Sequence, residues 1–153
     1  MHKYIPKKIL IMLNITKISF YLKRLNFKIF IQIVFIELFI KLFKNLSIKY
    51  SFSHTGEDLH ILSLFNDKKN GFYVEVGSNN PVTHSNTFKL YLSGWNGILI
   101  DANPKLIDIS KKIRKNDICI NALVSNKSYD TEFYISKNSN FSSINKIHVE
   151  NVV

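Results

Sequence analysis

The chain has 153 residues, which is enough for one ordinary domain and about half of what a complete nucleotide-binding α/β enzyme takes. Its formal net charge is +10, but residues 1–50 hold ten Lys and Arg against one acid, so the remaining residues carry only +1. A nucleic-acid-binding domain concentrates basic residues on its folded part, and this distribution therefore argues against nucleic acid as a partner. The single cysteine, Cys119, excludes an intrachain disulfide and a cysteine-built zinc site, and it fits a reducing compartment.

Residues 1–50 are predicted to form an apolar, lysine-rich helical segment. Between Ile9 and Leu46 the chain is rich in Ile, Leu and Phe and contains no glycine. The densest apolar stretch, 29–43, is shorter than the roughly 20 residues of a membrane span. Lysines flank it, and their side chains can reach anionic headgroups while their stems lie on apolar surface. We expect a cytoplasmic protein whose N-terminal segment contacts the inner face of the membrane; a true span and packing on the folded domain are the alternatives.

Residues 51–153 are predicted to begin an α/β fold. The first expected helix runs from a capping box at Thr55–Asp58 to Asn70-Gly71 and is followed by a strand at 72–76. A second helix starts at Pro81, with Phe88, Tyr91, Leu92 and Trp95 as its core face, and leads to a strand at 98–100. A third helix, capped by Asn103 with Pro104 as its first residue, is followed by strands at 118–124 and 131–135 and by a loop from Ser136. The basic end of the third helix, 111–115, is interpreted as solvated. Alternating strands and helices are typical of a parallel sheet.

Two of the expected strands end in polar groups that suit a nucleoside. The first runs into Gly77-Ser78-Asn79, where backbone can approach a ligand closely, and the second ends at Asp101, whose carboxylate can accept hydrogen bonds from ribose hydroxyls. Asp101 lies 24 positions after Gly77, near the offset of about 20 expected for such an acid. The turn has only one glycine, so a structural tight turn remains an alternative, as does a helix cap for Asp101. Together these groups predict a cofactor that contains a nucleoside.

Glu75 is an unusual residue for a buried strand end. A buried carboxylate needs donors or a cation, so a positively charged ligand group is one explanation for it. Backbone N–H groups at the rim of the sheet are the other. The histidines at 54, 60 and 84 do not have the spacing of metal ligands, and we expect no metal site.

Five ordered motifs resemble the FkbM-type family of S-adenosylmethionine-dependent methyltransferases. They are Ser53–Leu59, Gly71–Pro81, Ser85–Thr87, Gly94–Pro104 and Asn121–Ser125, and the resemblance covers about residues 53–145. It implies a partial doubly wound Rossmann-like methyltransferase sheet, S-adenosyl-L-methionine as cofactor, and a hydroxyl acceptor on a carbohydrate or related small molecule. By this resemblance Glu75 serves the methionine amino group, residues Gly77, Ser78 and Asn79 lie beneath the cofactor, and Asp101 binds the ribose. Asn103, close behind Asp101, is included in the predicted cofactor site.

The chain also departs from the family. Glu75 and Ser78 stand where the family commonly has Asp and Ala, and the family's later strands, with its substrate side, are not reached within 153 residues. We therefore expect a truncated enzyme for which no catalytic base is named. The strand at 72–76, central in the family, would become an exposed apolar edge able to pair with another chain. The alternatives are a non-catalytic membrane-associated remnant and a nicotinamide-dependent oxidoreductase fragment, which the missing glycines disfavour.

Overall fold

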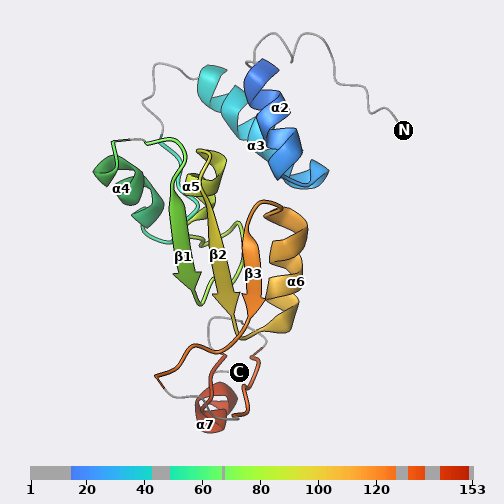
Figure 1. The fold of residues 1–153 in the computed structure, drawn as a ribbon, viewed down its shortest axis with the longest axis vertical. Helices are drawn as coiled ribbons and strands as arrows, with labels where there is room; N and C mark the ends of the chain where they lie inside the picture. The colour runs from blue at the N-terminus through green and yellow to red at the C-terminus, as the bar shows by residue number, and fades with distance from the viewer. Residues whose placement is uncertain (1–14, 43–48, 67, 127–130, 137–141, 152–153) are drawn as a thin grey trace.

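The computed structural model describes residues 15–42, 49–66, 68–126, 131–136 and 142–151. In chain order the elements are α2 (Ile15–Arg24), α3 (Phe27–Leu42), α4 (Glu57–Leu64), β1 (Phe72–Val76), α5 (Phe88–Leu92), β2 (Asn96–Asp101), α6 (Pro104–Ile113), β3 (Ile118–Asn121) and α7 (Lys146–Glu150), as labelled in Figure 1. The expectation of helix in 9–14 and 43–46 falls outside the described residues.

The three strands form a parallel sheet in the order β1-β2-β3. The register aligns Val74 with Ile98, and Ile98 with Ile118, so these side chains share one face of the sheet. The mixed α/β class and the strands at 72–76 and 98–100 are as predicted. The third strand ends at Asn121 rather than at Val124.

One face of the sheet is covered by α5 and α6. Leu99, at the centre of β2, is fully buried beneath them, and Tyr73 of β1 lies on the same face. Gly97 is required there because a Cβ on it would lie 2.0 Å from the carbonyl oxygen of Tyr73. Phe88 and Tyr91 of α5 stack at 6.3 Å between ring centroids and fill the centre of the core.

The other face of the sheet is apolar and exposed. Phe72, Val74 and Val76 alternate along β1 and are 56% to 59% exposed, and Ile118 of β3 is 59% exposed on the same face. Within the described residues β1 pairs only with β2, so it is an edge strand, as expected from the sequence. Burying this surface would be favourable by roughly 25 cal/mol per Å².

Helices α2 and α3 pack on the same core as the α/β elements. Six residues of these helices and of the turn between them belong to one buried cluster with residues of α4, β1, α5 and β2; they are Ile18, Tyr21, Leu25, Phe30, Ile33 and Val34. Arg24 donates to the carbonyl oxygen of Trp95 and its guanidinium lies 4.3 Å from the ring centroid of Tyr91. The hydroxyl of Tyr91 donates back to the carbonyl oxygen of Arg24 at 2.7 Å. The end of α2 is therefore fixed to α5.

Glu37 explains how an acid is accommodated in the apolar helix α3. Its carboxylate accepts from Lys17 Nζ at 2.6 Å and from the Tyr21 hydroxyl at 2.8 Å, so it ties α3 to α2. Helix α3 has 16 residues and extends about 24 Å at 1.5 Å per residue. None of the helices in the described ranges has the length and apolar character required to cross a bilayer.

The first helix of the α/β part begins differently from the expectation. Helix α4 starts at Glu57 behind Gly56, which has φ 95° and offers no side-chain cap, so the predicted capping box is wrong. Asp58 is instead fully buried and accepts from Ser51 Oγ at 2.5 Å and from the backbone N–H of Phe52 at 2.8 Å. The carboxylate expected at the helix start thus fixes the loop that precedes it.

The helix expected from Pro81 is much shorter than predicted. Residues 81–87 form bends and turns, and α5 covers only Phe88–Leu92. The Ser85 hydroxyl accepts from the Phe88 N–H at 3.1 Å and so serves the first turn of this helix. Trp95 follows the helix, where its indole N–H donates to the carbonyl oxygen of Lys68 at 2.7 Å.

Helix α6 starts as predicted, whereas the C-terminal expectations are wrong. Asn103 caps α6 and Pro104 is its first residue. In place of a strand at 131–135 the structure has one antiparallel bridge, between Tyr134 and Ser143, because no neighbouring strand lies there to pair with among the described residues. In place of a continuous loop, α7 forms behind Asn145, whose side chain accepts from the His148 N–H at 3.3 Å.

Candidate functional site

The turn after β1 lies directly against the end of β2. The backbone N–H groups of Gly77 and Ser78 both donate to the carbonyl oxygen of Ile100, at 2.8 and 3.1 Å. Gly77 has φ 70° and Asn79 has φ 48°, in the left-handed region that glycine and asparagine tolerate best. A Cβ on Gly77 would meet nothing within 4 Å, so glycine is favoured here by backbone conformation rather than by crowding.

Asp101 joins the turn after β1 to the turn after β2. Its Oδ2 accepts the backbone N–H of Asn79 at 2.8 Å, and its Oδ1 accepts that of Asn103 at 2.8 Å. The residue is only 9% exposed. Each carboxylate oxygen can accept a second hydrogen bond, so Asp101 can hold both turns and still receive ligand hydroxyls.

Two asparagines extend this arrangement. The Asn103 side chain accepts from the Lys105 N–H at 3.0 Å, so Asn103, not Asp101, caps α6. The Asn121 amide at the end of β3 donates to the carbonyl oxygens of Asp101 and Ala102, at 2.9 and 3.0 Å. The carboxyl ends of all three strands are therefore tied together.

A cavity of about 420 Å³ opens at these strand ends. Its lining consists of Val76, Gly77, Asn79, Asp101, Ala102, Asn103, Leu106, Ala122, Leu123, Val124, Phe133 and Ser142. In open parallel sheets, ligands bind in the crevice outside the carboxyl ends of the strands, which is where this cavity lies. Its volume is within the range of about 300 to 1,000 Å³ that small-molecule sites occupy.

Four of the six predicted site residues line this cavity; they are Gly77, Asn79, Asp101 and Asn103. Ser78 does not, because its side chain is buried, and its hydroxyl has no hydrogen-bond partner within the part of the chain that the structure describes. Glu75 also lies outside the lining. Its carboxylate accepts from the Thr87 hydroxyl at 2.5 Å and from the Asn86 N–H at 3.3 Å. Burial raises the pKa of Glu75, and the hydrogen bond from Thr87 opposes that shift.

Arg114 is not solvated, which corrects the interpretation of the basic end of α6. Its side chain is fully buried and its Nε lies 2.8 Å from Asp117 Oδ2. Its Nη2 donates to the Tyr73 hydroxyl at 2.7 Å and to Thr87 Oγ1 at 2.8 Å. Because Thr87 donates in turn to Glu75, a continuous chain of hydrogen bonds runs from α6 to the end of β1.

Four residues of this network and of the strand ends were not predicted individually from the sequence: Thr87, Arg114, Asp117 and Asn121. Thr87 and Asn121 fall inside motifs that carried the family resemblance, so a signal for them was present. Asp117 accepts from the Gly97 N–H at 2.9 Å and from the Tyr73 hydroxyl at 2.6 Å, which no local pattern reveals. Arg114 was hidden among lysines whose side chains are exposed.

The described residues contain no group of three or more His, Cys, Asp or Glu side chains arranged to hold a metal ion. The rings of His54 and His84 lie 5.2 Å apart between centroids, although the sequence places them 30 positions apart. Both side chains are exposed. This pair alone supplies too few ligands for a tetrahedral metal site.

A second cavity, of about 850 Å³, lies where α2 and α3 meet α5. Its lining includes Lys17, Lys41, Lys69 and Lys89 together with the aromatic rings of Phe20, Tyr21 and Tyr50. Lys89 donates to the carbonyl oxygen of Tyr50 at 3.1 Å. Burial lowers the pKa of Lys89 to about 8.

No protein-family model matches the chain, and neither the curated proteins nor the solved structures include a match to it. The interpretation of the site therefore depends on its own geometry. The cavity at the strand ends offers a carboxylate with spare acceptor capacity, a left-handed backbone turn and an apolar wall.

Proposed function

We propose that the chain binds S-adenosyl-L-methionine in the cavity at the strand ends and is the cofactor-binding part of an FkbM-type methyltransferase. The observation that carries this proposal is the position of Asp101. Its carboxylate lies at the mouth of two consecutive strand-to-helix connections, holds the turns of both, and lines the cavity. An acid at the end of the second strand is the group that binds ribose hydroxyls in nucleoside-binding α/β folds.

The residues present fit the nucleoside part of this cofactor. Ribose hydroxyls can donate to the lone pairs of Asp101 that the backbone N–H groups leave unused. The apolar part of the cavity wall, formed by Leu106, Leu123, Val124 and Phe133, suits the faces of a purine. Gly77 keeps the backbone accessible at the cavity without a side chain in front of it.

The methionine part of the cofactor has weaker structural support. Glu75 stands two residues before Gly77, as the resemblance requires, but its carboxylate already accepts from Thr87 and Asn86 and it does not line the cavity. We therefore assign the methionine amino group to Glu75 on the resemblance alone. The role of Asp101 is supported by both the resemblance and the geometry.

The cofactor supplies a methyl group on a sulfonium, which is already activated for transfer. Catalysis then depends mainly on holding an acceptor oxygen in line with that methyl group. The proposed acceptor is a hydroxyl group on a carbohydrate or a related small molecule, and this assignment comes from the resemblance.

Calorimetry on the full chain tests the proposal by titrating S-adenosyl-L-methionine and, separately, NAD. We expect saturable binding of S-adenosyl-L-methionine and markedly weaker binding of NAD. Tighter binding of NAD than of S-adenosyl-L-methionine would contradict the proposal and indicate a fragment of a nicotinamide-dependent oxidoreductase. If the protein unfolds cooperatively on heating but binds neither ligand, the proposal is contradicted and the chain is a non-catalytic remnant.

A further inference from the structure

Helix α3 is apolar on two sides, and only one of them is buried within the described structure. Phe30, Ile33 and Val34 are buried against the rest of the protein. On the other side Ile31, Phe35 and Leu42 follow at i, i+4 and i+11, which places them on one stripe at 100° per residue. Phe35 is 72% exposed and Leu42 is 70% exposed.

Large apolar side chains aligned in this way differ from scattered exposed ones. A helix that is hydrophobic all round is usually buried on all sides, by protein or by lipid. The stripe of Ile31, Phe35 and Leu42 continues over about three turns, and contiguous apolar surface of this kind marks an interaction site. The acid of α3 does not interrupt it, because Glu37 turns towards α2.

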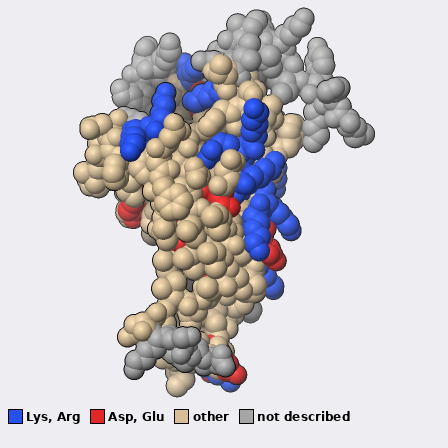
Figure 2. Space-filling model, viewed as in Figure 1, with Lys and Arg blue, Asp and Glu red and all other residues tan. Residues whose placement is uncertain are grey.

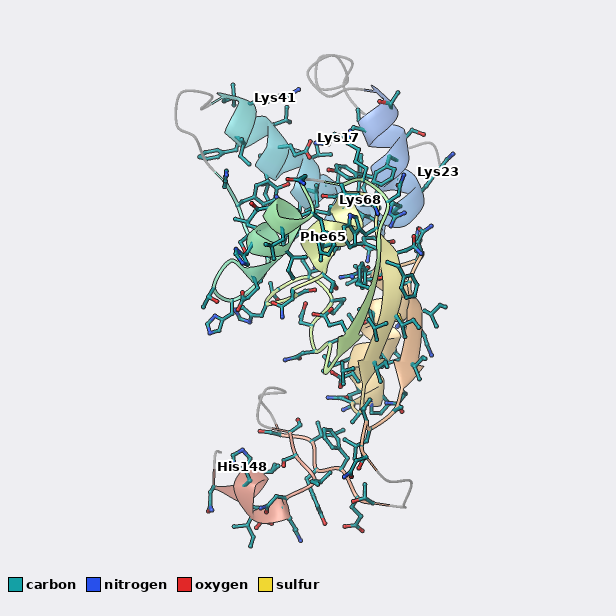
Figure 3. All side chains as sticks on the ribbon, turned by 60° about the vertical axis from the view of Figure 1, so that its left-hand side comes forward. Lys17, Lys23, Lys41, Phe65, Lys68 and His148 are labelled. Atoms are coloured by element: carbon teal, nitrogen blue, oxygen red, sulfur yellow. The ribbon has the colours of Figure 1, made fainter. Side chains whose placement is uncertain are left out.

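The charge around the stripe indicates what covers it. Lys28 is exposed three positions before Ile31, Lys23 is exposed in the last turn of α2, and residues 1–50 carry ten basic residues against one acid. Figure 2 shows Lys and Arg surface over the upper part, where Figure 1 places α2 and α3, and also further down the right-hand side, over α6. Figure 3 shows the labelled Lys23 on α2 and Lys41 near the end of α3.

We propose that α3 lies in the headgroup region of an anionic bilayer, with Ile31, Phe35 and Leu42 inserted and the neighbouring lysines on the lipid phosphates. Exposed apolar side chains can insert at the boundary between headgroups and acyl chains, and nearby lysines are attracted to anionic lipids. The described part of α3 extends about 24 Å, which is less than the roughly 30 Å of a hydrocarbon core. This inference is independent of the cofactor proposed above.

Vesicle co-sedimentation of the full chain tests the proposal. Vesicles of phosphatidylcholine alone are compared with vesicles that also contain anionic phosphatidylglycerol. We expect binding to the anionic vesicles, weak binding to the neutral ones, and loss of affinity as salt screens the lysines. Absence of binding to anionic vesicles would overturn the proposal.

Two variants that each remove an exposed phenylalanine ring locate the contact. Phe35→Gln removes the most exposed ring of the stripe and should weaken binding on the order of tenfold. Phe72→Gln removes a similarly exposed ring from the bare face of the sheet and should leave binding unchanged. Thermal melting of both variants verifies that they fold.

A third variant tests the role of the lysines. A second measurement tests whether another copy of the chain, and not a bilayer, covers the stripe. Lys23→Gln together with Lys28→Gln should weaken binding to anionic vesicles by about fivefold for each lysine. Equal weakening by Phe35→Gln and Phe72→Gln would overturn the proposal. A dimer in sedimentation equilibrium that Phe35→Gln dissociates, without vesicle binding, would overturn it in favour of a second copy of the chain.

Discussion

The carboxylate of Asp101 accepts the backbone N–H of Asn79 at 2.8 Å, across 22 positions of sequence. This bond joins the connection after β1 to the end of β2, and the second oxygen of Asp101 does the same for Asn103. One side chain therefore holds both turns and also lines the cavity. For the nucleoside that we propose, such a site would be pre-organised before binding, which would reduce the entropic cost.

The buried ion pair of α6 should dominate the stability of the α/β part. Arg114→Met leaves the carboxylate of Asp117 buried without its cationic partner and removes the donors to Tyr73 and Thr87, so we expect a loss of about 3 to 5 kcal/mol in the free energy of unfolding. Urea denaturation measures this loss. Lys115→Met, at the exposed neighbouring position, is the control and should change stability by less than about 0.5 kcal/mol. Similar effects of the two substitutions would show that the network contributes little.

Ser78→Ala should stabilise the protein. The Ser78 hydroxyl is buried and lacks a hydrogen-bond partner among the described residues, and such a group costs about 1 to 3 kcal/mol. Removing it should raise the melting temperature and leave the affinity for S-adenosyl-L-methionine unchanged, because only the backbone of this residue contributes to the turn. A lower melting temperature would indicate that the hydroxyl has a partner that stabilises the turn.

Lys89 should titrate at an unusually low pH. Burial lowers its pKa from 10.5 to about 8, so between these values the unfolded chain binds more protons than the folded protein does. The buried positive charge of Lys89 therefore destabilises the folded protein fully below pH 8. This destabilisation decreases above pH 8 and disappears by pH 10.5. NMR titration of the lysine side chains, with the Lys89→Gln spectrum for assignment, should give a midpoint near 8. A midpoint at 10.5 would contradict the buried position.

The bare face of the sheet should make the protein self-associate. Val74 is 56% exposed at the centre of β1, which is an edge strand within the described residues. Val74→Lys places a charge on this strand, as natural edge strands do, and should reduce association in sedimentation equilibrium. Leu64→Lys changes an equally accessible residue of α4 and should have no effect. A wild-type protein that is monomeric at every concentration would contradict this prediction.

The predictable parts of the fold were those with strong local signals. The apolar run of β1 and the Asn103-Pro104 start of α6 appear in the structure as expected, because a strand core and a helix cap depend on adjacent residues. The strand predicted at 131–135 failed because alternation alone does not supply a partner strand. The capping box failed because Asp58 instead accepts hydrogen bonds from Ser51, Phe52 and Ser53 in the loop before the helix.

The candidate site shows the same division. Gly77, Asn79 and Asp101 were found from strand ends and spacing, which topology brings together at one edge of the sheet. Arg114 was missed because its burial depends on hydrogen bonds to Tyr73, Thr87 and Asp117, which are distant in sequence from one another. No sequence pattern distinguishes it from its exposed lysine neighbours.

The central claim is that Asp101 binds the ribose of the cofactor, and the affinity of Asp101→Asn for S-adenosyl-L-methionine tests it most directly. The amide keeps the size of the side chain but removes its charge and one acceptor oxygen, so we expect a loss of about tenfold or more. Asp108→Asn, on the exposed side of α6, is the matched control and should bind like the wild type. Thermal melting of both variants separates unfolding from loss of binding. Calorimetry that gives a folded Asp101→Asn protein with unchanged affinity would contradict the assignment.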